Sequence, residues 1–279
     1  MKRVLVPIDF SEASMNALEY GLQIANLFEA DLRVMHVVTG KHYAPPFEYD
    51  QPELFIRGRV DEWMEKVLKD IRPRYKVTGG KVDIKIREGN VTKEISNQAK
   101  YDDSSMIVLG SHGISGFEDK WVGSNAYRLV SNTMCPVLLV RKGMPWKPLK
   151  KIVLPIDITK ESRMKIPVVV GFGKLFNSTI HVVGMKRTSM LFVYNRIKSA
   201  IRQVQDFVEK KAGLESEYGI IEGNNLPQKL LEYAENVNAD LIAVRIHHDT
   251  NPFNDLIRPF VNEVINYSER PVLVVPTHE

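Results

Sequence analysis

The sequence contains a single cysteine, Cys135, among its 279 residues, so no disulfide can form within the chain. So little cysteine is typical of a reducing compartment, and we expect a cytoplasmic protein. No apolar run approaches the roughly 20 residues of a membrane-spanning helix. In the opening stretch, MKRVLVPIDF, Pro7 and Asp9 interrupt the apolar run far below the length of a signal peptide. We therefore expect no membrane partner.

A strong charge of one sign is also missing, because the formal net charge is only +4. Proteins that bind nucleic acid usually carry a concentrated basic face, so we expect no nucleic-acid partner. Hydrophobic residues make up 44% of the chain, which fits a globular protein with a substantial core. A length of 279 residues is about right for two domains.

The same pattern occurs twice along the chain. RVLVPIDF near the start corresponds to KIVLPIDI from Lys151, and CPVLLV from Cys135 corresponds to RPVLVV from Arg270. Between the copies lies RKGMPWKPLK, whose glycine and prolines are typical of a short linker. The repeat predicts two domains, residues 1–142 and 149–279.

Each copy alternates patterns typical of strands and of helices. Short apolar runs predict five buried strands in the first copy: Val4–Ile8, Leu32–Val38, Val82–Ile86, Met106–Leu109 and Val137–Val140. Apolar residues at helical spacing predict a helix over Val60–Ile71, and Ser11 is placed as the N-cap of an earlier one. A matching helix in the second copy is predicted by Ile197, Ile201, Val204, Phe207 and Val208. Strands joined by helices predict two tandem α/β domains, each a doubly wound parallel sheet of five strands.

A loop rich in glycine follows the fourth predicted strand, within VLGSHGISGFEDKWVGSNAYRLV. Ligands of open parallel sheets bind beyond the carboxyl ends of the strands, which is where this loop begins. Gly110 and Gly113 can adopt positive φ and allow a phosphate to approach the main chain. Gly123, Ser124 and Asn125 then offer unpaired N–H groups at a helix start. The loop therefore predicts a phosphate site, unless its glycines only shape a tight connection.

Other residues at the same edge add to this prediction or limit it. Asp9, after the first strand, is placed to accept hydrogen bonds from an exocyclic amine or a ribose hydroxyl. His112 is expected to stabilise the loop by hydrogen bonding rather than to act in catalysis. The sequence has neither a GxxxxGK[ST] loop nor a GxGxxG fingerprint, which disfavours the common triphosphate hydrolases and dinucleotide oxidoreductases.

Taken together, VPIDFSEAS, the HVV after the second strand, and the Gly-x2-Gly-x9-Gly-Ser motif from Gly110 to Ser124 resemble the universal stress protein family in its tandem form. The resemblance implies an adenine-nucleotide alpha-hydrolase-like fold and a role in stress response, with ATP bound together with Mg²⁺. It implies that members with this motif bind ATP and that members lacking it generally do not. It also implies an adenine pocket and a ribose-phosphate site in residues 1–142, formed by Pro7, Ile8, Asp9, Val37, Gly89, Gly110, His112, Gly113, Gly123, Ser124 and Asn125.

Within that set, the resemblance places Asp9 and Val37 against the adenine, with Pro7 and Ile8 lining the pocket. The glycines of the motif, with His112, Ser124 and Asn125, surround the ribose and phosphates. Gly89, in EGNV, either borders the pocket or is simply a turn glycine.

The second copy departs from the motif at its decisive positions. Gly110, Gly113, Gly123 and Ser124 correspond to Arg245, His248, Arg258 and Pro259. Side chains thus replace the glycines, and we expect this copy to have lost a triphosphate site. Because Pro155 and Asp157 are retained, an adenine-like pocket without a phosphate cradle stays open as an alternative.

Three other functions stay open beside a nucleotide-regulated binding or signalling protein. One is an enzyme that cleaves nucleotides, at most a slow ATPase, although no SGGxDS signature is present: TGGKVD from Thr78 differs from it. Another is an interaction scaffold with a vestigial site and an unidentified protein partner. A metal site at His247 and His248 is disfavoured, because adjacent residues point in different directions and no other ligand lies at suitable spacing.

The final strands of the two copies predict how the domains associate. PVLLV and PVLVV are apolar and would otherwise be exposed sheet edges. Single-domain members of the family pair through this strand, so the resemblance implies an intramolecular pseudo-dimer. A further homodimer of the whole chain is left open.

Overall fold

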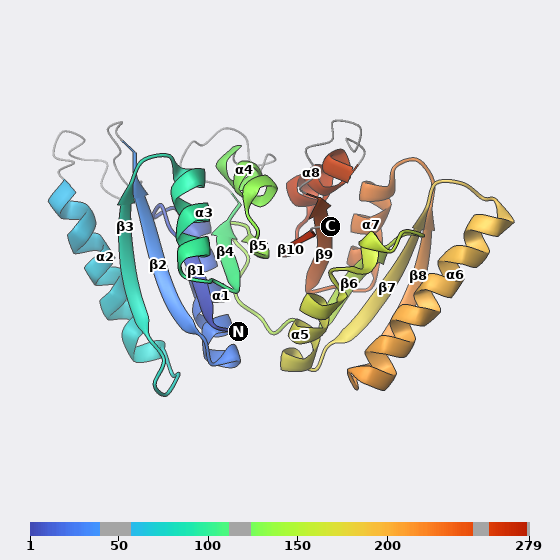
Figure 1. The fold of residues 1–279 in the computed structure, drawn as a ribbon, viewed down its shortest axis with the longest axis horizontal. Coiled ribbons are helices and arrows are strands. Elements are labelled where there is room, and N and C mark those ends of the chain that lie inside the picture. Colours follow the sequence, from blue (N-terminus) through green and yellow to red (C-terminus); the bar gives the residue numbers. More distant parts are fainter. Residues whose placement is uncertain (40–56, 112–123, 248–256, 278–279) are drawn as a thin grey trace. The chain divides into compact units, whose positions relative to one another are not determined.

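A computed structural model of the chain describes residues 1–39, 57–111, 124–247 and 257–277. The chain divides into two compact units, Met1–Trp146 and Lys147–Glu279, which are coloured blue to green and green to red in Figure 1. Both units are built of parallel strands joined by helices.

The first unit has five strands in the order β3-β2-β1-β4-β5, and every adjacent pair is parallel. Its elements are β1 Arg3–Pro7, α1 Glu12–Phe28, β2 Asp31–Val38, α2 Arg57–Ile71, the 3-10 turn η2 Arg72–Arg74, β3 Val82–Glu88, α3 Val91–Tyr101, β4 Met106–Gly110, α4 Ser124–Asn132 and β5 Val137–Val140. The chain moves outward from β1 to β3 and then returns to the other side at β4. The strand order therefore reverses between β1 and β4, the place where ligands bind in sheets of this kind.

The second unit repeats this plan with the order β8-β7-β6-β9-β10, again parallel throughout. Its elements are β6 Lys151–Ile156, the 3-10 turn η3 Glu161–Arg163, α5 Ile166–Phe176, β7 Thr179–Lys186, α6 Leu191–Asp206, the π-helical turn η4 Phe207–Lys211, β8 Ser216–Glu222, α7 Leu226–Asn236, β9 Leu241–His247, α8 Ile257–Tyr267 and β10 Val272–Thr277. The prediction of two tandem doubly wound sheets of five parallel strands is confirmed.

Local sequence signals explain where several helices begin and which face they bury. Ser11 is the N-cap of α1 as predicted, and its Oγ accepts a hydrogen bond from the backbone N of Ser14 at 3.3 Å. In α2 the predicted apolar stripe from Val60 to Ile71 is buried, except that Val67 is half-buried. The matching stripe of the second unit is buried at four of its five positions, but Phe207 is exposed, so that part of the prediction was wrong. Phe207 begins the π-helical turn, where the spacing of a regular α-helix no longer holds.

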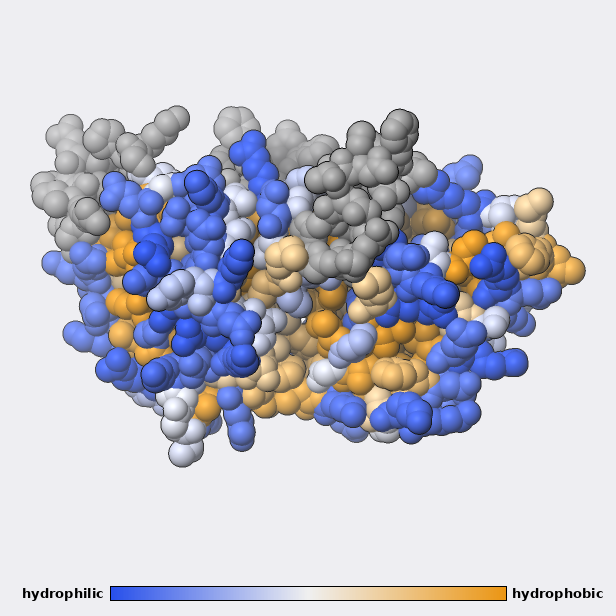
Figure 2. All heavy atoms as spheres, viewed as in Figure 1, coloured by the Kyte–Doolittle hydropathy of each residue, from blue (hydrophilic) through white to orange (hydrophobic). Residues whose placement is uncertain are grey.

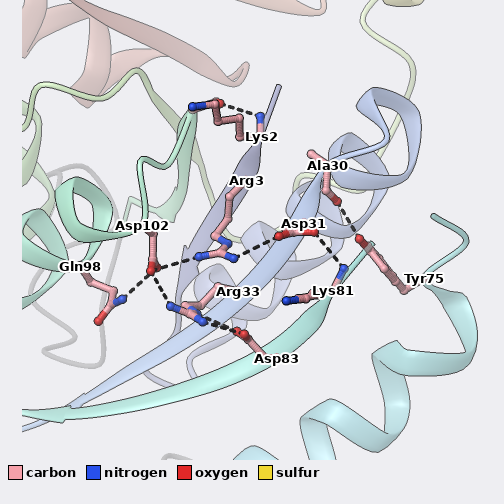
Figure 3. Close-up of polar contacts among 11 residues, drawn as sticks. Lys2, Arg3, Ala30, Asp31, Arg33, Tyr75, Lys81, Asp83, Gln98 and Asp102 are labelled. Carbon is pink, nitrogen blue, oxygen red and sulfur yellow. Dashed lines mark hydrogen bonds and ion pairs between the residues drawn. The ribbon is translucent and has the colours of Figure 1, made fainter. Parts of the chain in front are cut away.

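An ion-pair network joins the amino ends of the strands in the first unit, at the sheet edge opposite the switch point (Figure 3). Arg33 of β2 forms a bidentate ion pair with Asp83, which lies opposite it on β3. Its Nε and Nη2 donate to the two carboxylate oxygens at 2.7 and 2.6 Å. Asp102, at the end of α3, has a side chain only 2% exposed and accepts from Arg33 at 2.6 Å and Arg3 at 3.1 Å. Gln98 donates to its second oxygen at 2.8 Å. The Asp102 carboxylate therefore links the end of α3 to strands β1 and β2.

Replacing Asp102 with asparagine should destabilise the first unit. The variant keeps the shape of the side chain but leaves two partly buried guanidinium groups without their shared carboxylate. We expect the free energy of unfolding to fall by about 2 kcal/mol, measured by urea denaturation. Asp103→Asn is the matched control, since Asp103 and its partner Lys2 have side chains 76% and 78% exposed, and it should leave stability unchanged. Equal loss in both variants would contradict the assignment of the network.

Candidate functional site

The residues after β1 form a turn held by the side chain of Asp9. Its Oδ1 accepts hydrogen bonds from the backbone N of Ser11 at 3.1 Å and from Ser11 Oγ at 2.5 Å. The backbone N of Asp9 donates to Ser14 Oγ at 3.2 Å. Asp9 therefore has a structural task that the sequence did not reveal, because it fixes the turn that leads into α1.

The second unit builds the same turn from different residues. Asp157 Oδ1 accepts from the backbone N of Thr159 at 2.7 Å and also from its hydroxyl. The backbone N of Asp157 donates to Ser162 Oγ at 3.2 Å. The presence of an aspartate in both copies is thus explained by the turn alone, without a ligand.

His36 of β2 lies directly beneath this turn and was not among the predicted site residues. Its Nδ1 is 2.8 Å from the carbonyl oxygen of Ile8, and the residue is 4% exposed. Burial lowers the pKa of His36, against the smaller opposing effects of the Ile8 carbonyl and Asp9. The ring is therefore neutral at pH 7, with Nδ1–H donating to Ile8. A histidine among the apolar residues of Val34–Val38, the carboxyl part of β2, was the signal available in the sequence.

Aromatic side chains also pack around the turn that follows β1. Phe10 has a positive φ of 63° and lies with its ring 5.0 Å from His36 and 5.6 Å from Trp63 of α2. Ile8 continues the sheet ladder, since its N donates to Met35 O at 2.8 Å. Contacts with the sheet, with α1 and with α2 therefore fix the position of the carboxyl end of β1.

Val37 and Gly89 lie at the carboxyl ends of β2 and β3. Val37 is buried, with 9% exposed. Gly89 has φ of +140° and donates to Val38 O at 3.0 Å. Gly223 occupies the same turn in the second unit, with φ of +130° and a bond to Lys186 O at 3.1 Å. A turn that requires positive φ therefore suffices to explain Gly89, and its contact with a ligand stays a prediction.

Gly110 ends β4, but not for the conformational reason predicted from the sequence. Its backbone is not in the left-handed region, so the expectation of positive φ was wrong. A Cβ at this position would lie 2.7 Å from the backbone C of Ala13 and 2.7 Å from the backbone N of Ser14. Glycine is required here because the end of β4 touches the first turn of α1.

Of the remaining predicted site residues, only some lie among the described residues. His112, Gly113 and Gly123 lie outside the described residues. The backbone of Ser124 and Asn125 forms the start of α4. The described residues thus bring together the ends of β1, β2, β3 and β4, with Pro7, Ile8, Asp9, Val37, Gly89 and Gly110 at one edge of the sheet.

Across the described ranges, no group of three or more His, Cys, Asp or Glu side chains is placed to hold a metal ion. The alternative at His247 and His248 falls outside the side chains that the structure describes. Among the same ranges, no helix combines the length and apolar character needed to cross a bilayer.

Comparisons with known proteins agree on one family. Its model, described as Universal stress protein family, matches residues 1–141. Universal stress protein YxiE of Bacillus subtilis is 32% identical over 149 residues, covering 50% of this chain and 98% of its own. Universal stress protein Rv2624c of Mycobacterium tuberculosis is 23% identical over 279 residues, covering 99% and 96%. A solved universal stress protein from Archaeoglobus fulgidus shares the fold, with a TM-score of 0.74 at 20% identity over 98% of each chain.

The contact at Gly110 predicts a stability effect that is independent of any ligand. Gly110→Ala should lower the free energy of unfolding of the first unit by about 2 kcal/mol, because the methyl group forces β4 and α1 apart. The control is Gly171→Ala, within α5, where an added Cβ meets nothing within 4 Å. It should be neutral or stabilising by about 0.5–1 kcal/mol. Calorimetric unfolding of both variants tests this, and an unchanged Gly110→Ala protein would refute the packing role.

Proposed function

Because the chain belongs to the universal stress protein family, we propose that its first unit binds ATP as a regulatory ligand. The observation that carries the proposal is the glycine–serine motif, intact from Gly110 to Ser124 and replaced at its corresponding positions in the second copy. The motif connects β4 to α4 at the switch point of the first sheet. It therefore starts where a ligand of such a sheet is expected.

The described residues fit an adenine nucleotide in their chemistry. Ile8 and Val37 are apolar residues at the buried strand ends, which suits the surroundings of a base. Asp9 is held by its turn, and a carboxylate has capacity to accept further bonds, here from the adenine amine or a ribose hydroxyl. The first N–H groups of α4 have no partners within the helix and suit phosphate oxygens. Mg²⁺ would enter with the phosphates, whose oxygens are its usual ligands.

The rigidity of this edge also supports binding. His36 holds Ile8, Asp9 holds the start of α1, and Gly110 lies against Ala13 and its neighbour. A ligand arriving at an edge already fixed in this way loses less free energy to ordering the protein. The connection between Gly110 and Ser124 then supplies the donors that bind phosphate.

Valine at Gly113 or Gly123 should abolish ATP binding, since a branched side chain blocks the approach of phosphate to the backbone. Isothermal titration calorimetry should give one ATP per chain for the unaltered protein and none for either variant. Arg258→Val is the matched control, because Arg258 is the second copy's counterpart of Gly123, and it should leave ATP affinity unchanged. Undiminished affinity in both glycine variants would show that the motif does not hold the phosphates.

We propose further that ATP is held rather than turned over efficiently. Rapid phosphoryl transfer needs a positioned nucleophile, anchored metal ions and cationic groups aimed at the transferred phosphate. A glycine loop supplies backbone donors that bind the ground state, and such uniform binding does not accelerate chemistry. A single-turnover assay with labelled ATP and Mg²⁺ should therefore find slow or undetectable hydrolysis. A rate in the usual enzyme range of about 1–1000 per second, lost on changing His112 or Asp119, would contradict this.

A further inference from the structure

The second unit contains a pocket of about 350 Å³ at the carboxyl edge of its own sheet. This is the edge that corresponds to the candidate nucleotide site of the first unit. All lining residues belong to the second unit: Pro155, Asp157, Ile158, Thr159, Ser162, Lys165, Met185, Lys186, Arg187, Val193, Leu226, Val244, Arg245 and Phe260. The volume lies at the lower end of the range for small-molecule sites, roughly 300–1,000 Å³.

Arg245 brings a guanidinium group to this pocket without a full set of partners. Its Nη1 is buried and donates to no acceptor among the described residues. Burial lowers the pKa of Arg245, while Asp157 and Glu161 act in the opposite direction. A buried donor left unpaired is destabilising, and a charged one more so. The arrangement is accounted for if a ligand supplies the acceptor.

Lys165 places a second cation in the same pocket. Only 2% of the residue is exposed, and its Nζ donates to the carbonyl oxygens of Pro155 at 2.6 Å and Ser162 at 2.5 Å. An ammonium group has three donors, so one remains for a further acceptor. Burial and, to a smaller extent, the nearby Arg245 lower the pKa of Lys165 to about 7, against the raising effect of Asp157. An anion between Lys165 and Arg245 would offset the unfavourable burial of both positive charges.

The described residues that line the pocket therefore carry a net positive charge. Lys186 is paired with Glu222, so it adds little net charge. Among the lining residues that the structure describes, Asp157 is the one carboxylate, against the basic residues Lys165, Arg245 and Arg187. The excess favours a ligand with a negative group.

Two basic residues of the pocket replace small residues of the first unit. Ala17 and Gly110 of the first unit correspond to Lys165 and Arg245 here. The first turn of α1, which packs on Gly110, has no α-helical counterpart, because η3 precedes a helix that begins only at Ile166. In place of the α-helical turn and the glycine of the first unit, the second unit thus has a 3-10 turn and the side chain of Arg245.

Apolar side chains form the rest of the lining and continue to the surface. The lining includes Ile158, Met185, Val193, Leu226, Val244 and Phe260. Next to Val193, the residues Met190, Leu191 and Phe192 are 67%, 72% and 68% exposed. Figure 2 shows an apolar patch in the region of α6, at whose amino end these three residues lie. A ligand with an apolar body fits such surroundings better than a triphosphate does.

We propose that this pocket binds a small organic carboxylate, with its anionic group between Arg245 and Lys165 and its apolar body against Phe260 and the neighbouring aliphatic side chains. The guanidinium of Arg245 provides the planar pair of donors that suits a carboxylate. This site is separate from the ATP site proposed for the first unit, and either proposal can be wrong without affecting the other.

The test uses 2-naphthoate as probe and the full chain. Isothermal titration calorimetry should show one naphthoate bound per chain. Arg245→Met, which keeps the apolar stem but removes the charge, should weaken binding about tenfold or more. The neutral analogue 2-naphthamide should be weaker by a similar factor. Arg202→Met, which removes an exposed arginine from α6, is the matched control and should not alter the affinity.

Two further measurements separate this site from folding defects and from ATP binding. Without ligand, Arg245→Met should raise the melting temperature, because a guanidinium whose buried Nη1 has no acceptor is replaced by an apolar side chain. Its ATP affinity should equal that of the unaltered chain. No naphthoate binding at millimolar concentration, or equal binding by Arg245→Met or of naphthamide, would overturn the proposal. Displacement of naphthoate by inorganic phosphate at lower concentration would assign the pocket to phosphate instead and overturn the carboxylate.

Discussion

The contact between the end of β4 and the first turn of α1 determines the shape of the candidate nucleotide site. No side chain fits between Gly110 and the backbone of Ala13 and Ser14, where a Cβ would lie 2.7 Å from both. With this contact made, α1 begins at its N-cap Ser11, and Asp9 closes the turn before it. The β4–α4 connection therefore starts beside the end of β1, at the switch point of the sheet. The proposed ATP site depends on this arrangement.

The second unit shows which features of that edge belong to the fold and which belong to the site. Its sheet order, its aspartate turn at Asp157 and its positive-φ turn at Gly223 are the same as in the first unit. These features satisfy backbone groups and occur whether or not the glycine motif is present. The difference lies at Arg245, which replaces the glycine, and at Lys165, which is buried where the first unit has Ala17. Retention of Asp157 is therefore not a sign of an adenine pocket.

The repeat, the strands and the first helix cap could be predicted from the sequence because they depend on local patterns. Apolar runs bounded by turns marked β1 to β5, and Ser11 caps α1 through a residue three positions away. The packing reason for Gly110 and the role of His36 could not be predicted, since both depend on contacts between distant segments. The same holds for Arg33, which meets Asp83 and Asp102 only once strand register and α3 are in place. The association of the two units through their final strands stays a prediction, as do the roles of residues 112–123.

The central claim is that ATP binds at the edge of the first sheet and not at that of the second. Hydrogen–deuterium exchange of the full chain, with and without ATP and Mg²⁺, tests it most directly because it locates the ligand along the chain. Slower exchange is predicted in segments around Ile8, Val37 and Gly110 and at the start of α4, with no change around Lys165 and Arg245. Protection confined to the second unit, or equal in both, would contradict the account.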